Sequence, residues 1–210
     1  MNKAILIPIL FSSAVSAVEI ENSFSGYNLE LYKNQRYWQD VNLDGIDWAF
    51  WYGKDKSVSK VDSGLISKIS LVGDVTIVTN KPVHGNKYYW RGGSYADYLN
   101  ESGYGFTFNG DGSGISFTIS PKKAGDFTVD VYSHNWISSS ITTACVDSEC
   151  VVSDNDITLY MTANKNKIRF TTVNAEQRLT VKLTRKASQW DFYEDHGYYS
   201  IEAINVKEGK

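Results

Sequence analysis

The stretch FTVDVY, residues 127–132, alternates apolar and polar side chains without interruption. Because successive side chains of a strand point to opposite faces, Phe127, Val129 and Val131 would all lie on one face of an extended strand. The stretch LTVKLT, residues 179–184, repeats the pattern. Alternation of this kind predicts antiparallel strands with one face buried and the other face in water.

Working outward from these two runs, short segments of strand-like composition alternate with turn-forming residues. We expect further strands at residues 74–79, 105–108, 115–119, 140–146, 157–162, 167–173 and 198–206. We expect breaks where Gly, Pro, Asn and Asp gather, at residues 109–114, 121–125 and 164–167. Many short strands without alternating helices predict an all-β fold, a two-sheet antiparallel β-sandwich of the jelly-roll kind.

The amino-terminal residues have the order of an export signal. Lys3 precedes an apolar run over residues 4–11, and small residues stand at Val15 and Ala17. This order predicts a secretory signal peptide, residues 1–17, ahead of a single β-sandwich domain, residues 18–210. No later segment approaches the roughly 18 uninterrupted apolar residues of a transmembrane helix, so we expect a secreted or periplasmic protein without a membrane span.

Composition narrows the choice of partner. The formal net charge is -3 and the 21 Lys and Arg residues are scattered along the chain, so nucleic acid is not expected as a partner. The 6 Trp and 14 Tyr residues exceed what the packing of a small sandwich requires. Some aromatic side chains are therefore expected at the surface.

The chain has 2 cysteines, Cys145 and Cys150, separated by Val-Asp-Ser-Glu. In an exported protein, two cysteines across a short turn favour a disulfide that staples a hairpin. Because the closed loop is short, the loss of chain entropy predicts a stabilisation below the ~3 kcal/mol of a loop of about 15 residues. A thiol nucleophile or a metal-binding pair is disfavoured, since no second cysteine pair exists.

The segment DWAFWYG, residues 47–53, concentrates aromatic side chains. As a strand it would be apolar on both faces, with Trp48 and Phe50 on one face and Trp51 on the other. Such a strand lies between two layers or at a sheet end covered by a loop. Trp48 and Trp51 are therefore expected in a core, where large aromatics dominate, and not in a ligand site.

The neighbouring segment DVNLDG, residues 40–45, matches the first half of a calcium-binding loop. The twelfth position, where such a loop needs an acid, is occupied by Trp51. Asn and Asp also gather in turns because their side chains bond locally to the backbone, so a turn is the favoured interpretation.

Four local matches make the chain resemble the galactose-binding-like jelly-roll modules of secreted bacterial proteins, which often occur beside glycan-degrading enzymes. They are residues 47–53, similar to an Asp-Trp-x-x-Trp-Gly opening; 103–106 leading to 115–119; 127–132 followed by Trp136; and 178–183 ahead of the closing strand 201–206. The resemblance implies the fold and an exported protein. It supplies no catalytic residues.

The closing strand, IEAINV, also resembles the Ile-Asp-x-Ile ending of several carbohydrate-binding modules, in which the acid ligates a structural calcium. Glu202 takes the place of that acid here. The resemblance therefore implies a structural calcium between Glu202 and an amino-terminal acid, Glu21 or Glu19. No other cofactor is expected.

Sugar recognition needs a flat aromatic face for the C–H side of the ring and planar polar side chains for its hydroxyls. Three segments combine both: 88–91 (YYWR), 134–136 (HNW) and 190–196 (WDFYEDH). Trp90 is interpreted as structural. The expected ligand-binding residues are Arg91, Asn135, Trp136, Trp190, Asp191 and Tyr193. Aromatic loops on a rigid scaffold predict a non-catalytic, lectin-like carbohydrate-binding protein.

Two other function classes stay open. Tyr and Trp are also enriched at protein interfaces, so an extracellular adhesin or matrix module is an alternative. A small glycan hydrolase or lyase is a second alternative, for which Asp191, Glu194 and Asp195 would supply carboxylates. His84, His134 and His196 have no zinc-binding spacing, so an enzyme is less favoured.

Overall fold

The computed structural model describes residues 17–27, 40–53, 56–73, 86–94, 98–99, 105–156, 161–187 and 197–209. Within these ranges every regular element is a strand, and the strands form sheets of seven, five and three members. Across the same ranges, no helix has the length and apolar character needed to cross a membrane. The predicted all-β class is confirmed.

The large sheet has the order β1–β13–β10–β15–β3–β4, and β8 also pairs with β15. Its pairings are antiparallel. Its strands are β1 (Val18–Tyr27), β3 (Asp47–Gly53), β4 (Lys56–Ser59), β8 (Phe106–Phe108), β10 (Gly125–Trp136), β13 (Met161–Thr172) and β15 (Tyr198–Glu208). The expected run 127–132 lies in β10, near the middle of this sheet.

The second sheet has the order β12–β11–β14–β9–β5, again antiparallel. Its strands are β5 (Ser70–Val72), β9 (Gly114–Ile119), β11 (Ser138–Val146), β12 (Glu149–Asn155) and β14 (Leu179–Ala187). The small third sheet contains β2 (Asp40–Leu43), β6 (Lys87–Trp90) and β7 (Tyr98–Leu99), and β2 pairs with β6 in parallel.

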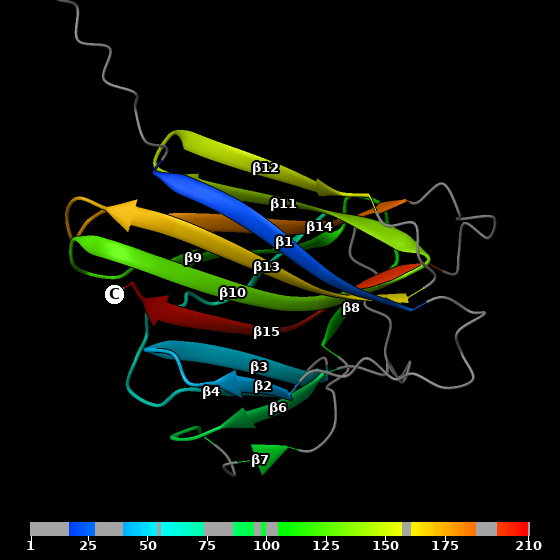
Figure 1. Ribbon diagram of the computed structural model, residues 1–210, viewed down its shortest axis with the longest axis horizontal. Coiled ribbons are helices and arrows are strands. Elements are labelled where there is room, and N and C mark those ends of the chain that lie inside the picture. The colour runs from blue at the N-terminus through cyan, green and yellow to red at the C-terminus, as the bar shows by residue number, and fades with distance from the viewer. Residues whose placement is uncertain are drawn as a thin grey trace, which may run out of the picture.

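The large sheet packs against the five-stranded sheet around the main core. Figure 1 shows β1 and β13 of the large sheet crossing β14 and β9 of the five-stranded sheet, whereas β15, β3 and β4 lie lower in the view. Val129 and Val131 of β10 belong to the same cluster of buried apolar side chains as Val181 and Leu183 of β14. The alternation read in the two runs therefore predicted the buried faces correctly, and the two-sheet antiparallel sandwich is the observed arrangement.

A second core lies on the other face of the large sheet, beneath the small sheet. Trp48 and Phe50 of β3 pack there with Tyr88 and Trp90 of β6. Trp51 points the opposite way into the main core. Trp48 is 1% and Trp51 7% exposed. The prediction that β3 lies between two layers, with its tryptophans in a core, is confirmed.

The break expected at residues 164–167 is wrong, because β13 continues through it from Met161 to Thr172. Asn164 and Asn166 point into the sandwich and are buried, whereas Lys165 and Lys167 are only half-buried. The segment therefore alternates like a strand, but with amides on its inner face. Asn166 accepts a hydrogen bond from the Asn155 amide at 3.2 Å, which replaces the local backbone bonds of a turn.

The other expected strands divide into two groups. The segments 105–108, 115–119, 140–146, 167–173 and 198–206 correspond to β8, β9, β11, β13 and β15, with small differences in their ends. The expected strand at 74–79, residues 157–160 and residues 1–16 of the predicted signal peptide lie outside the described residues.

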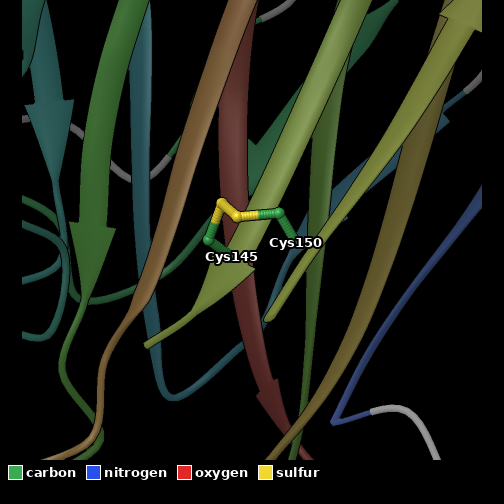
Figure 2. Close-up of a disulfide and its surroundings, with 2 residues drawn as sticks. All are labelled: Cys145 and Cys150. Atoms are coloured by element: carbon green, nitrogen blue, oxygen red, sulfur yellow. A yellow bond between two sulfur atoms is a disulfide. The ribbon is translucent and has the colours of Figure 1, made fainter. Parts of the chain in front are cut away.

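The predicted disulfide joins Cys145 and Cys150 across the β11–β12 hairpin (Figure 2). The two residues are direct partners in the antiparallel register, and their Cα atoms are 4.1 Å apart. Asp147 makes the tight turn with a positive φ of 53°. The bond thus closes a short loop at the tip of a hairpin that is already paired.

We expect the double substitution Cys145→Ser and Cys150→Ser to lower the free energy of unfolding by about 2 kcal/mol, because so small a loop gains little chain entropy when the bond is lost. Urea unfolding measures this value. Reductant should destabilise the wild-type protein by a similar amount and leave the double variant unchanged. A loss above about 4 kcal/mol would show that the bond does more than close the loop.

Candidate functional site

An open cleft of about 660 Å³ lies where β2 and β6 end, beside the residue that follows β4. Its lining includes Asn42, Asp44, Gly45, Trp48, Lys60, Tyr89, Trp90 and Arg91. The cleft therefore unites two segments that the sequence singled out separately, residues 40–45 and residues 88–91. Arg91, one of the expected ligand-binding residues, is among its lining residues.

The parallel pairing of β2 with β6 sets the directions of the side chains. Asn42 is the register partner of Tyr89, and Leu43 is the partner of Trp90. Leu43 and Trp90 point into the second core, because alternate residues of a strand face opposite sides. Asn42 and Tyr89 consequently face outward, where Asn42 is exposed and Tyr89 half-buried. Arg91 follows this strand and is exposed.

Asn205 of β15 holds the turn that forms one wall of the cleft. Its side chain is fully buried, and its Oδ1 accepts a hydrogen bond from the Gly45 N–H at 2.9 Å. Its amide donates to the Asn42 carbonyl at 3.3 Å and to the Asp44 carboxylate at 3.4 Å. The turn at the end of β2 is thereby fixed to β15 of the large sheet, which makes this wall of the cleft rigid.

Two glycines permit the close approach of the cleft walls. A Cβ at Gly45 would lie 2.1 Å from the Val206 carbonyl oxygen, so only glycine lets this turn rest on β15. A Cβ at Gly93 would lie 2.7 Å from the Trp48 ring. Gly93 therefore allows the chain after Arg91 to cross directly over the aromatic residues of the second core.

The charges of the cleft are held in fixed positions. The Lys60 ammonium donates to the Gly45 carbonyl at 2.6 Å, and the Lys60 backbone N–H donates to the Trp48 carbonyl at 3.0 Å. Asp44 lies 3.1 Å from the Lys207 ammonium. Partial burial raises the pKa of Asp44, but the hydrogen bond and positive charge of Lys207 outweigh it and lower that pKa. Asp44 is thus a carboxylate at neutral pH.

A second cleft, of about 730 Å³, lies between β3, β4 and residues 60–69. Its most conspicuous polar residue, Asp47, is buried, and its carboxylate accepts hydrogen bonds from the backbone N–H groups of Leu65 and Ile66 at 2.8 and 2.9 Å. Asp47 also accepts a hydrogen bond from the Ser63 hydroxyl. These contacts clamp the loop, so Asp47 has a structural role and this cleft is the weaker candidate.

The expected ligand-binding residues of β10 do not lie on the same face. Asn135 is 0% exposed inside the sandwich, where it accepts a hydrogen bond from the Asn164 amide and donates to the Ser138 hydroxyl at 3.4 Å. Trp136 points to the opposite face and stacks on Tyr198, with ring centroids 6.0 Å apart. The expectation that Asn135 and Trp136 serve one site is corrected, because neighbours on a strand diverge.

The remaining expected ligand-binding residues, Trp190, Asp191 and Tyr193, lie outside the described residues. The described ends of the strands that flank them are nevertheless informative. Trp136 is the register partner of both Met161 and Tyr198. β15 therefore begins beside Trp136, at the end of the strands opposite to Asn205 and Val206, which contact the turn of the cleft at Arg91.

The structure does not bring together the acids proposed for calcium. From Glu21 the cross-strand row runs through Lys167 and Asp130 to Asn205, so β13 and β10 separate Glu21 from β15. Three strand spacings of roughly 4.8 Å place these backbones on the order of 14 Å apart. Glu21 instead pairs with Arg169 at 2.7 Å, whose hydrogen bond is the main cause of its lowered pKa.

Glu202, the other proposed calcium ligand, joins the two layers of the second core. It accepts a hydrogen bond from the Tyr88 hydroxyl, and its Oε1 lies within hydrogen-bonding distance, 2.9 Å, of Nδ1 of His134. All three side chains are buried. Burial, reinforced by the negative charge of Glu202, raises the pKa of Tyr88 well above its usual value. The hydroxyl therefore remains protonated and donates.

Sequence reasoning missed this group and missed Lys60. The run IEAINV did contain a hint, since a lone acid in an otherwise apolar strand must find a buried partner. Nothing in the sequence around Lys60 distinguishes it from other lysines. Within the ranges that the structure covers, no group of three or more His, Cys, Asp or Glu side chains is placed to hold a metal ion.

Comparison with protein-family models, with curated proteins and with solved structures gave no match. The ligand of the cleft is therefore inferred from the cleft's own residues.

Proposed function

We propose that the protein is an exported, non-catalytic carbohydrate-binding protein and that the cleft at Arg91 is its sugar site. The observation that carries this proposal is the row of outward side chains on the small sheet, where the half-buried Tyr89 ring stands beside Asn42 and Arg91 follows two residues after Tyr89. An aromatic ring flanked by planar polar groups is the combination that sugar recognition needs.

The chemistry of the row matches the two sides of a pyranose. The Tyr89 ring offers an apolar face for axial C–H groups, while the Asn42 amide and the Arg91 guanidinium pair with hydroxyls. The Tyr89 hydroxyl lies 3.4 Å from the Asp40 carboxylate, which steadies the ring. Because the cleft is open and shallow, each site binds weakly, and repeated sugar units strengthen attachment to a polymer.

Export is part of the same proposal. It is supported by the predicted signal peptide and by the disulfide, since such bonds persist in oxidising compartments. β1 begins at Val18, the residue after the predicted cleavage position. The resemblance to galactose-binding-like jelly-roll modules supports export in the same way. A protein partner for the same row remains the competing proposal that the binding experiment must separate.

We expect Tyr89→Ala to weaken glycan binding by about tenfold or more, because loss of the stacking ring removes the main apolar contact. A glycan array identifies the ligand, and affinity electrophoresis in that glycan measures retention. The array should be read with and without a chelator, which tests the calcium expectation directly. Val152→Ala, an exposed apolar substitution on the five-stranded sheet, is the control and should bind normally.

Retention by Tyr89→Ala equal to that of the wild-type protein would remove the cleft from the proposal. Trp136→Ala and Trp190→Ala form the second arm, because both residues were expected to bind ligand from the sequence and neither lines the cleft at Arg91. A loss confined to these two variants would move the sugar site there. No retention on any glycan would favour a protein partner.

A further inference from the structure

We infer that the cleft selects an acidic sugar, a hexuronate or a sulfated hexose, whose anionic group lies against Lys60 and Arg91. The inference rests on the proposed function, because it names the kind of sugar that the same cleft takes. The supporting observation is an imbalance in the lining of the cleft. The lining has more hydrogen-bond donors and positive charges than its acceptors and carboxylate can pair with.

Lys60 is the fixed cation of the cleft. Lys60 is half-buried, and its ammonium donates one N–H to the Gly45 carbonyl at 2.6 Å. The ammonium has two further N–H groups that can donate to a ligand. Its backbone is bridged to Gly93, and the adjacent Val61 N–H donates to the Gly92 carbonyl at 3.1 Å. The ammonium is therefore held in place before a ligand arrives, so little side-chain freedom is lost on binding.

Arg91 brings the second cation to the same place. It precedes Gly92 and Gly93, the residues whose backbone is joined to Lys60 and Val61. Among the residues that the structure describes, no carboxylate forms an ion pair with Arg91 or with Lys60. By contrast, Lys207 beside the cleft is paired with Asp44.

Asp44, the acid of the cleft, does not neutralise these cations. Its Oδ1 is already 3.1 Å from the Lys207 ammonium and within 3.4 Å of the Asn205 amide. The lining thus supplies an ammonium and a guanidinium, against one carboxylate that already contacts Lys207 and Asn205.

A ligand that complements this lining must be rich in acceptors. The hydroxyls of a neutral sugar both donate and accept, so they make no particular use of two adjacent cations. A carboxylate or sulfate only accepts, and charge-assisted hydrogen bonds to Lys and Arg are about twice as strong as neutral ones. A sugar whose C–H face lies on Tyr89 and whose anionic substituent lies against Lys60 and Arg91 therefore uses both the apolar and the cationic groups of the cleft.

The experiment compares acidic and neutral forms of one polymer. Affinity electrophoresis and calorimetry are run with polygalacturonate, with the fully methyl-esterified polymer, and with sulfated and unsulfated galactan, each at low and high salt. In at least one of the two pairs, we expect the charged polymer to bind about tenfold or more tightly than its neutral counterpart. This difference in affinity should shrink in high salt. Which pair responds distinguishes a carboxylate from a sulfate.

Arg91→Gln is the diagnostic variant, because Arg91 is exposed and pairs with no carboxylate of the described ranges, so the change should leave the fold intact. We expect it to bind the acidic polymer no more tightly than the neutral one, because the charge-assisted contact with the anionic group is lost. Arg178→Gln, an equally exposed arginine in the turn before β14, is the matched control. Lys60→Met tests the second cation, with thermal unfolding as a check that the Gly45 turn survives.

The possible outcomes separate the two levels of the proposal. Equal binding of acidic and neutral polymers that is lost in Tyr89→Ala overturns the inference and leaves the sugar site in place. Acid-selective binding that Arg91→Gln does not alter also overturns it, because the anion then lies elsewhere. If the protein binds none of the four polymers and no glycan on the array, the proposed function itself is overturned.

Discussion

Replacing Glu202 with alanine is expected to lower the free energy of unfolding by about 3–5 kcal/mol, although Glu202 contributes nothing to the cleft surface. Its carboxylate is the shared acceptor for the Tyr88 hydroxyl and His134 Nδ1, and all three side chains are buried. Its removal leaves two polar groups without that partner in a region that water does not reach. Urea unfolding, followed by tryptophan fluorescence, measures the loss.

Two milder variants test the cause of this effect. Tyr88→Phe removes one hydrogen bond and little volume, so we expect a smaller loss of about 1–3 kcal/mol. Glu202→Gln keeps the shape of the side chain and one acceptor, so its loss should lie between zero and that of alanine. If Glu202→Ala cost less than about 1 kcal/mol, the buried group would not be what ties the small sheet to the large one.

Trp48→Ala is the second large effect, with an expected loss of about 3–5 kcal/mol. Trp48 is 1% exposed and packs with Phe50, Tyr88 and Trp90 beneath the small sheet. Truncation removes a large apolar surface and leaves a cavity that the sheets cannot fill by moving closer. Thermal and urea unfolding both report it. Val61→Ala, which changes a residue 50% exposed, is the control and should stay within about 0.5 kcal/mol.

Trp48 also lines the cleft, so the same variant separates a core residue from a sugar-stacking residue. A core role predicts a less stable protein whose folded fraction still binds glycan to a measurable extent. A stacking role predicts wild-type stability with binding lost. The second result would show that the DWAFWYG segment serves the ligand and not the second core.

The period-two runs carried most of the information about the fold. In β10 and β14 the apolar positions are those that meet in the main core, because the strand alternation transfers directly into faces of a sheet. β3 was also read correctly, since a strand with tryptophan on both faces needs cover on both sides. The cysteine spacing was sufficient for the hairpin disulfide.

The candidate site was less accessible from the sequence. Arg91 was expected to bind ligand and lies in the cleft, but Lys60 joins it only through the bridge between Lys60 and Gly93. Asn135 was expected to bind ligand because a planar amide beside a tryptophan suits sugar recognition. It faces inward, where Asn164 and Ser138 are its partners. A strand with polar residues on its inner face has the composition of a loop. Its hydrogen-bond partners, which the sequence does not show, identify it as a strand.

Local alternation thus determined the β class, the buried faces of β10 and β14 and the position of β3 between two layers. Each of these follows from side-chain direction within a few consecutive residues. The tertiary structure alone decided that residues 40–45, Lys60 and residues 88–91 form one cleft, and that Glu202 meets Tyr88 and His134. These contacts join segments far apart in the chain, and their partners are chosen by how the sheets stack, which no local pattern records.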